Sequence, residues 1–160
     1  MKDSNLLQNN NKEYCSKKGW QASRLPHIDL LNHYFFITCT IVDGFILSEL
    51  DKDIVYNSII YHNKNLYELH ALVVMDTHFH IIINSFKPLP QIMHSIKSYS
   101  SHKINKLNKR KGRLWRREYY DQIIRNDKDY IEKTNYVINN PKKVNLNNYK
   151  WLYVIYEYER

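Results

Sequence analysis

The chain has 160 residues, of which 43% are hydrophobic and 25% charged, so it is long enough for one globular domain and too short for two. No apolar run approaches the roughly 20 residues that a membrane-spanning helix needs, and the Asn- and Lys-rich start does not resemble a signal peptide. We expect residues 1–24 to form a flexible tail and residues 25–160 a single domain, with no membrane contact. The two cysteines, Cys15 and Cys39, indicate reduced thiols in a cytoplasmic protein, and Cys39 is expected in the core.

The first half of the domain reads as a strand, a helix and two further strands. β-Branched and aromatic residues predict a strand over 34–42, followed by a turn at Asp43-Gly44. Ser48 with Asp51 three residues later marks a helix start, and apolar residues at helical spacing predict a helix over 50–64. Strands over 66–75 and 77–85 follow, and the short Asp76-Thr77 step between them favours an antiparallel hairpin.

The second half alternates helix and strand again. The spacing predicts a helix over 90–109, a basic loop over 109–113 and a strand over 119–125. Asn126 or Asp127 caps a last main helix, which Pro141 ends, and residues 151–156 form a small strand or a packing segment. The order β-α-β-β-α-β predicts an α+β, ferredoxin-like (split βαβ) antiparallel sheet with helices on one face plus a C-terminal helix.

The formal net charge of +8 is concentrated in one segment, which points to a polyanionic partner. Between residues 97 and 117 the chain has nine basic residues and no acidic one. These residues are Lys97, Lys103, Lys106, Lys109, Arg110, Lys111, Arg113, Arg116 and Arg117. Aromatic residues interleave them, as in proteins that bind single-stranded nucleic acid, although a solvated helix face has the same charge pattern. Trp115 either anchors the core or stacks on a base.

Two histidines, His78 and His80, interrupt the apolar strand 77–85. Side chains two residues apart on a strand point to the same face, so the two imidazoles converge while Phe79 points to the other face. Two neutral imidazoles on a rigid strand make half of a divalent-metal site.

The last main helix supplies a possible second half. Tyr136 and Asn140 are four residues apart, so they are neighbours on one helical face. An amide oxygen is a metal ligand and a tyrosine can act as a nucleophile, which together favour phosphodiester chemistry with Mg²⁺ or Mn²⁺. Tyr119 and Tyr120 are alternative nucleophiles, ranked lower because they lie in a predicted strand.

At these positions the chain resembles the REP-associated tyrosine transposases, a branch of the single-tyrosine transposases in the His-hydrophobic-His superfamily of single-strand DNA nucleases. The matching segments are Arg24-Leu-Pro-His27, 34–38, 73–83, Leu114-Trp115 with 119–125, and Tyr136-Val-Ile-Asn-Asn-Pro141. They span residues 24 to about 145, nearly all of the expected domain.

The resemblance implies a role for each matching residue. His78, His80 and Asn140 would hold the metal, and Tyr136 would attack the phosphate to give a 5′-phosphotyrosine link and a free 3′-hydroxyl. The substrates would be single-stranded or hairpin DNA with imperfect palindromes, and the protein would be cytoplasmic, nucleoid-associated, and a monomer or a homodimer. The chain departs from the family at Asp76-Thr77, where members carry Pro-Asn, and this change would place a carboxylate near the metal.

Two alternatives remain open. The same sheet underlies nucleic-acid-binding modules whose strand aromatics stack on bases. A domesticated transposase would bind its hairpins without cleaving them.

Overall fold

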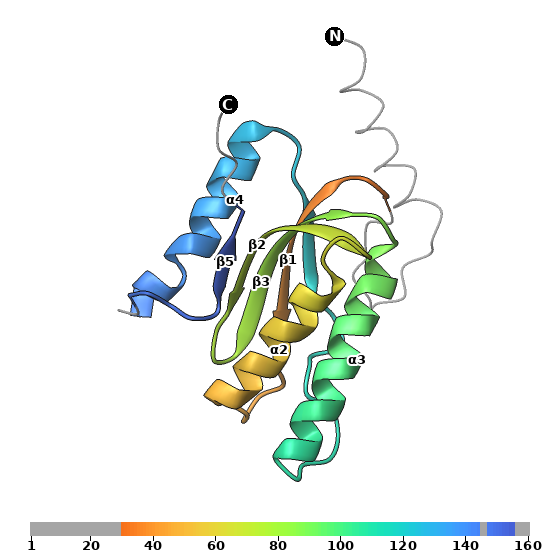
Figure 1. Ribbon diagram of the computed structural model, residues 1–160, viewed down its shortest axis with the longest axis vertical. Coiled ribbons are helices and arrows are strands. Elements are labelled where there is room, and N and C mark those ends of the chain that lie inside the picture. Colours follow the sequence, from red (N-terminus) through yellow and green to blue (C-terminus); the bar gives the residue numbers. More distant parts are fainter. Residues whose placement is uncertain (1–29, 145–146, 156–160) are drawn as a thin grey trace.

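A computed structural model describes residues 30–144 and 147–155, which form one antiparallel sheet with helices on both faces (Figure 1). The expected tail, residues 1–24, lies outside the described residues, as do residues 156–160. In chain order the elements are β1 (Tyr34–Thr40), α2 (Glu49–His62), β2 (Tyr67–Val74), β3 (His78–Ser85), α3 (Leu89–Leu107), β4 (Tyr120–Ile123), α4 (Asp127–Asn139), the 3₁₀ turn η1 (Pro141–Val144) and β5 (Leu152–Val154).

The strand order is β4-β1-β3-β2-β5. Its first four strands have the order that a split βαβ unit produces, which confirms the predicted ferredoxin-like sheet. β5 adds a short antiparallel strand beside β2, where Ala71 pairs with Val154. Of the two roles expected for residues 151–156, the structure therefore shows the strand, over 152–154.

Helices α2 and α3 cover one face of the sheet and enclose the larger core. The helix α2 begins at Ser48, whose side chain and that of Asp51 form the predicted capping box. In α3, Pro90 occupies the first turn, where a missing N–H costs no hydrogen bond. Within α3, Ile104 is buried, while Tyr99 and Leu107 are half exposed.

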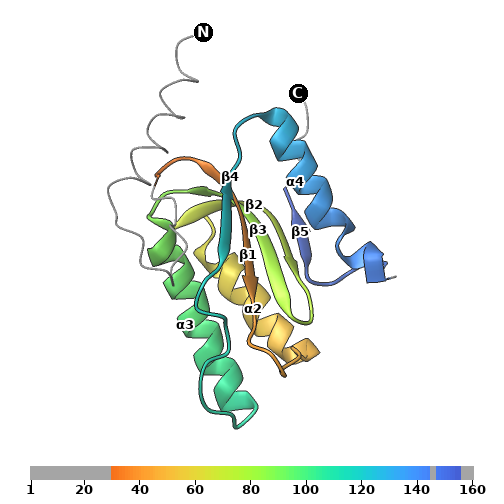
Figure 2. The ribbon, with the colours of Figure 1, turned by 180° about the vertical axis from the view of Figure 1, so that it is seen from behind.

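Helix α4 lies on the opposite face, as the reverse view makes clear (Figure 2). It contributes one fully buried side chain, Val137, to a small cluster with Phe36, Ala71, Val73, Met75 and Ile82. This confirms a C-terminal helix set apart from the other two. None of the helices within residues 30–144 and 147–155 is long and apolar enough to cross a membrane.

Candidate active site

The two histidines of β3 share the face that α4 covers. His80 is 4% exposed, its ring centroid lies 4.7 Å from that of His78, and both side chains stand on the same side of the strand. Phe79, between them, belongs to the larger core on the opposite face, where its ring packs edge-on against Trp115. The alternation predicted from the sequence is therefore the arrangement in the fold.

Thr38 on the neighbouring strand β1 fixes the orientation of His80. The Thr38 hydroxyl lies 2.8 Å from His80 Nδ1, while Nε2 is buried and has no hydrogen-bond partner among the described residues. A buried nitrogen without a partner is costly, and a metal ion would satisfy it.

Both imidazoles are held in the neutral form that binds metals. Burial lowers the pKa of His80 to about 3, and the charges of His78 and Lys143 add to the effect. Burial also lowers the pKa of His78, against the opposing influence of a hydrogen bond with Asn140 and of the Asp76 carboxylate. Neutral imidazole is the ligand form, so neither ring has to lose a proton before it binds a cation.

Asn140 ends α4 and reaches the histidine pair. Its side chain is 7% exposed and hydrogen-bonds with His78, and its amide nitrogen is buried without a partner among the described residues. Residues 30–144 and 147–155 contain no group of three His, Cys, Asp or Glu side chains placed to hold a metal ion. The available donors are therefore two imidazoles and an amide oxygen, a mixed set that fits Mn²⁺ or Mg²⁺ with positions left for other oxygens.

Tyr136 stands over this group, on the same face of α4 as Asn140. Its ring makes edge contacts with His80, at 5.1 Å between centroids, and with Phe36, at 5.8 Å. The side chain is 42% exposed, so one side of the phenol remains open to a substrate. One chain thus brings together the His pair of β3 and the tyrosine and asparagine of α4.

Lys143 is a site residue that the sequence reasoning missed. Its ammonium lies 4.3 Å from the centroid of the Tyr136 ring, and its charge acts on His80. The signal was present in the two lysines directly after Asn140-Pro141, but the basic segment considered ended at Arg117. The 3₁₀ turn η1 places Lys143 beside the phenol.

The lower-ranked tyrosines occupy different environments. Tyr119 is 7% exposed in the α2–α3 core, with the Lys97 ammonium 5.8 Å from its ring. Tyr120 is half exposed and pairs with Thr38 across β1 and β4.

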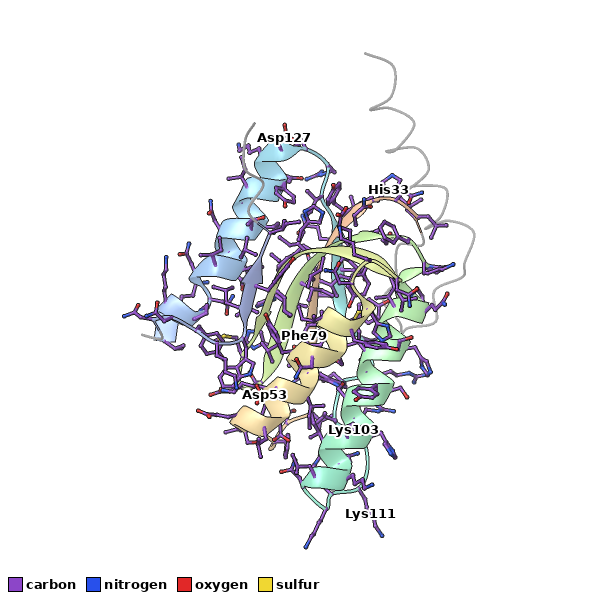
Figure 3. All side chains as sticks on the ribbon, viewed as in Figure 1. His33, Asp53, Phe79, Lys103, Lys111 and Asp127 are labelled. Carbon is purple, nitrogen blue, oxygen red and sulfur yellow. The ribbon has the colours of Figure 1, made fainter. Side chains whose placement is uncertain are left out.

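The predicted basic segment runs along α3 and the loop after it. Lys103 and Lys111 extend away from the body of the protein (Figure 3). Six of the nine basic side chains are exposed. Among residues 30–144 and 147–155, five of these six form no hydrogen bond, ion pair or ring contact through their charged groups, and Lys103 lies 5.6 Å from the Tyr99 ring. The six are Lys103, Lys106, Lys109, Lys111, Arg113 and Arg117. Arg110 bonds to Asn105, and Arg116 pairs with Asp43.

Two residues of the basic segment have structural positions. The ammonium of Lys97 donates to the backbone carbonyls of Arg116 and Arg117, at 2.8 and 2.9 Å, and so holds that segment against α3. Trp115 is 1% exposed and donates to Ser100 Oγ at 2.9 Å. A buried indole offers no face to a base, so the structure decides for the core role and against DNA contact by Trp115.

The departure from the family pattern at Asp76 predicted a carboxylate near the metal. In the structure this carboxylate also forms an ion pair outside the histidine pair. It accepts a 2.9 Å hydrogen bond from the ammonium of Lys52 on α2. The Lys52 ammonium also lies 4.3 Å from the ring of Trp151. The carboxylate is thus engaged in tying the β2–β3 turn to α2 and to the segment before β5.

The sequence profile described as "Transposase IS200 like" matches residues 32–140, and the chain belongs to that family. No curated protein matches the chain.

One solved structure agrees on the fold, and a second is similar at a lower level. A REP-associated tyrosine transposase bound to a REP hairpin superposes with a TM-score of 0.64 at 21% identity, over 77% of this chain and 74% of that one. A transposase candidate from Deinococcus radiodurans R1 gives a TM-score of 0.44 at 20% identity, over 77% of this chain and 96% of that one.

Proposed function

We propose that this protein is a metal-dependent tyrosine transposase that cleaves and rejoins single-stranded DNA beside a hairpin. The observation that supports this most directly is the meeting of Tyr136, His78, His80 and Asn140 in one chain, from two elements far apart in sequence. Membership of the IS200-like transposase family supports the same reaction class.

Tyr136 is the proposed nucleophile. Its Oη forms a bond to the phosphorus as the bond from phosphorus to the 3′ oxygen breaks, which leaves a 5′-phosphotyrosine and a free 3′-hydroxyl. The phenol loses its proton and the departing 3′ oxygen gains one, so the exchange needs no nucleotide cofactor. A divalent cation, Mg²⁺ or Mn²⁺, would polarise the phosphate when bound and neutralise charge that develops on its oxygens.

The residues around Tyr136 have separate tasks. His78, His80 and Asn140 would hold the cation, and Thr38 keeps His80 turned so that its free nitrogen faces the site. The edge contacts with Phe36 and His80 orient the phenol. The Lys143 ammonium is placed to contact a phosphate oxygen beside the reacting phenol.

The exposed cations of α3 and the following loop are the proposed contacts to the DNA backbone. These exposed side chains form no ion pair with any residue that the structure describes, so their charges are available to phosphates. They are Lys103, Lys106, Lys109, Lys111, Arg113 and Arg117. Two of them, Arg113 and Arg117, line a groove of about 420 Å³ between α3 and residues 113–119. The relative bound to a REP hairpin supports hairpin DNA as the partner.

The test is covalent capture. Purified protein is incubated with Mn²⁺ and labelled single-stranded DNA from the flanks of its own gene, then run on a denaturing protein gel. We expect a shifted band that needs metal and is absent in Tyr136→Phe, while Tyr61→Phe, a control on exposed α2 surface, retains it.

The outcomes separate the alternatives. Adducts formed by Tyr136→Phe would move the nucleophile to another residue. Hairpin binding without any adduct, in protein that Mn²⁺ stabilises, would identify a binder that does not cleave.

A further inference from the structure

The face of the sheet that carries the histidine pair is only partly covered. Helix α4 packs over β2, β3 and β5. Towards the opposite edge, Thr38, Thr40 and Gln122 are half-buried, and Tyr120 is 52% exposed. A large aromatic side chain exposed beside a catalytic centre contributes little to the core and is available to a ligand.

The strand register places Tyr120 in line with His80. Tyr120 pairs with Thr38, and Thr38 pairs with His80, so the three side chains stand on one face in a row across β4, β1 and β3. Neighbouring strands are about 4.8 Å apart, which puts the Tyr120 backbone about 10 Å from that of His80. The hydroxyl of Thr38 between them already contacts His80.

Arg116 belongs to the same face. Trp115 forms a bridge with Ile41, and the Arg116 N–H donates to the Thr40 carbonyl at 2.8 Å. The Trp115 side chain points to the α3 core, so alternation extended from this bridge directs the Arg116 side chain towards the face that carries His78, while the residue also lines the groove beside α3. Its guanidinium is half exposed and pairs with Asp43, an exposed ion pair of the weak kind that a phosphate can displace.

The exposed ring of Tyr120 and the guanidinium of Arg116 are the two kinds of group that bind the base and the phosphate of a nucleotide. The Tyr120 hydroxyl donates sideways to Gln122 Oε1 at 3.2 Å, which leaves the ring available for stacking. An aromatic face binds bases of any sequence, and a guanidinium contacts phosphate oxygens. We name Arg116, Tyr120 and Gln122 the β4 platform.

We infer that the β4 platform holds one nucleotide of the strand to be cut, with its base stacked on Tyr120 and its phosphate at Arg116. This inference rests on the proposed function, because the platform is useful only if single-stranded DNA crosses this face to reach Tyr136. It gives Tyr120 a binding role in place of the nucleophilic role that the sequence left open.

The experiment measures binding without cleavage. Every variant carries Tyr136→Phe, metal is left out, and fluorescence anisotropy follows a short fluorescein-labelled single strand of mixed sequence and an equally long strand whose central sugars are abasic. We expect Tyr120→Ala to weaken binding of the intact strand about fivefold or more and Tyr120→Phe to leave it unchanged. Arg116→Gln should weaken both strands equally, because it removes a phosphate contact.

The abasic strand is the decisive control. It should bind Tyr120→Ala and the parent protein equally, since it has no base to stack. Tyr61→Ala, which removes an exposed tyrosine of α2 on the other side of the sheet, should bind both strands as the parent does. Equal loss on both strands, or no loss in Tyr120→Ala, would overturn the inference. If the base-dependent loss is found here while the protein with Tyr136 intact forms no adduct in the Mn²⁺ capture assay, the platform is retained and the cleavage mechanism is rejected.

Discussion

The two faces of the sheet differ in how much apolar surface they bury. The face under α2 and α3 buries a continuous apolar core that includes Phe79, Ile81 and Trp115. The face under α4 buries a smaller cluster with one fully buried residue from the helix, and it leaves His80 Nε2 and Asn140 Nδ2 without partners among the described residues. The first face supplies most of the apolar packing, whereas the second is less well packed and leaves buried polar atoms that the proposed metal ion would satisfy.

The largest effect is expected from Tyr136→Phe, which changes the second face without disturbing the first. Covalent adduct formation should disappear, because the reacting oxygen is removed while the ring still contacts His80 and Phe36. Thermal unfolding should be unchanged within error. A large fall in melting temperature would mean that the hydroxyl is part of the packing.

A matched pair on β3 measures the difference between the faces directly. Ile81 and Ile82 are adjacent, fully buried and chemically identical, but Ile81 faces α2 and α3 while Ile82 faces α4. We expect Ile81→Ala to lower the free energy of unfolding by about 4 kcal/mol and Ile82→Ala by about 2 kcal/mol, since a loosely packed site collapses more easily around the cavity.

Urea denaturation measures both changes. Equal decreases in the free energy of unfolding would show that the α4 face is packed as tightly as the face under α2 and α3.

Metal binding should stabilise only a protein with an intact second face. At a Mn²⁺ concentration one hundred times its Kd, the free energy of unfolding of the parent protein should rise by about 2.7 kcal/mol. His80→Gln should lose that gain because the buried nitrogen no longer reaches the ion, and His62→Gln on α2 is the matched control. The shift in thermal midpoint with Mn²⁺ measures the gain, and an equal shift in His80→Gln would place the ion elsewhere.

The smallest effect is expected from Lys143→Gln. The rate of adduct formation should fall about tenfold to a hundredfold, because a cation next to the reacting phosphate is lost. Lys142→Gln, its exposed neighbour, should react at the parent rate in a single-turnover assay. Equal rates for both variants would remove Lys143 from the site.

Local periodicity is enough to predict most elements and the two residue pairs of the proposed site. Alternation along β3 places His78 and His80 on one face, and the spacing of four along α4 pairs Tyr136 with Asn140. The ends of strands and helices differ from the prediction by at most two residues, because terminal hydrogen bonds depend on neighbours such as Trp115, which bridges Ile41 beyond β1.

The sequence by itself therefore determined which side chains share a face, because the periods of strands and helices are local properties of the backbone. Only the tertiary structure decided which faces meet. In the folded chain Trp115 is buried, the Lys97 ammonium donates hydrogen bonds to two backbone carbonyls, and Lys143 lies beside the Tyr136 ring. Those outcomes depend on contacts between distant segments, which no local pattern of charge or hydrophobicity specifies.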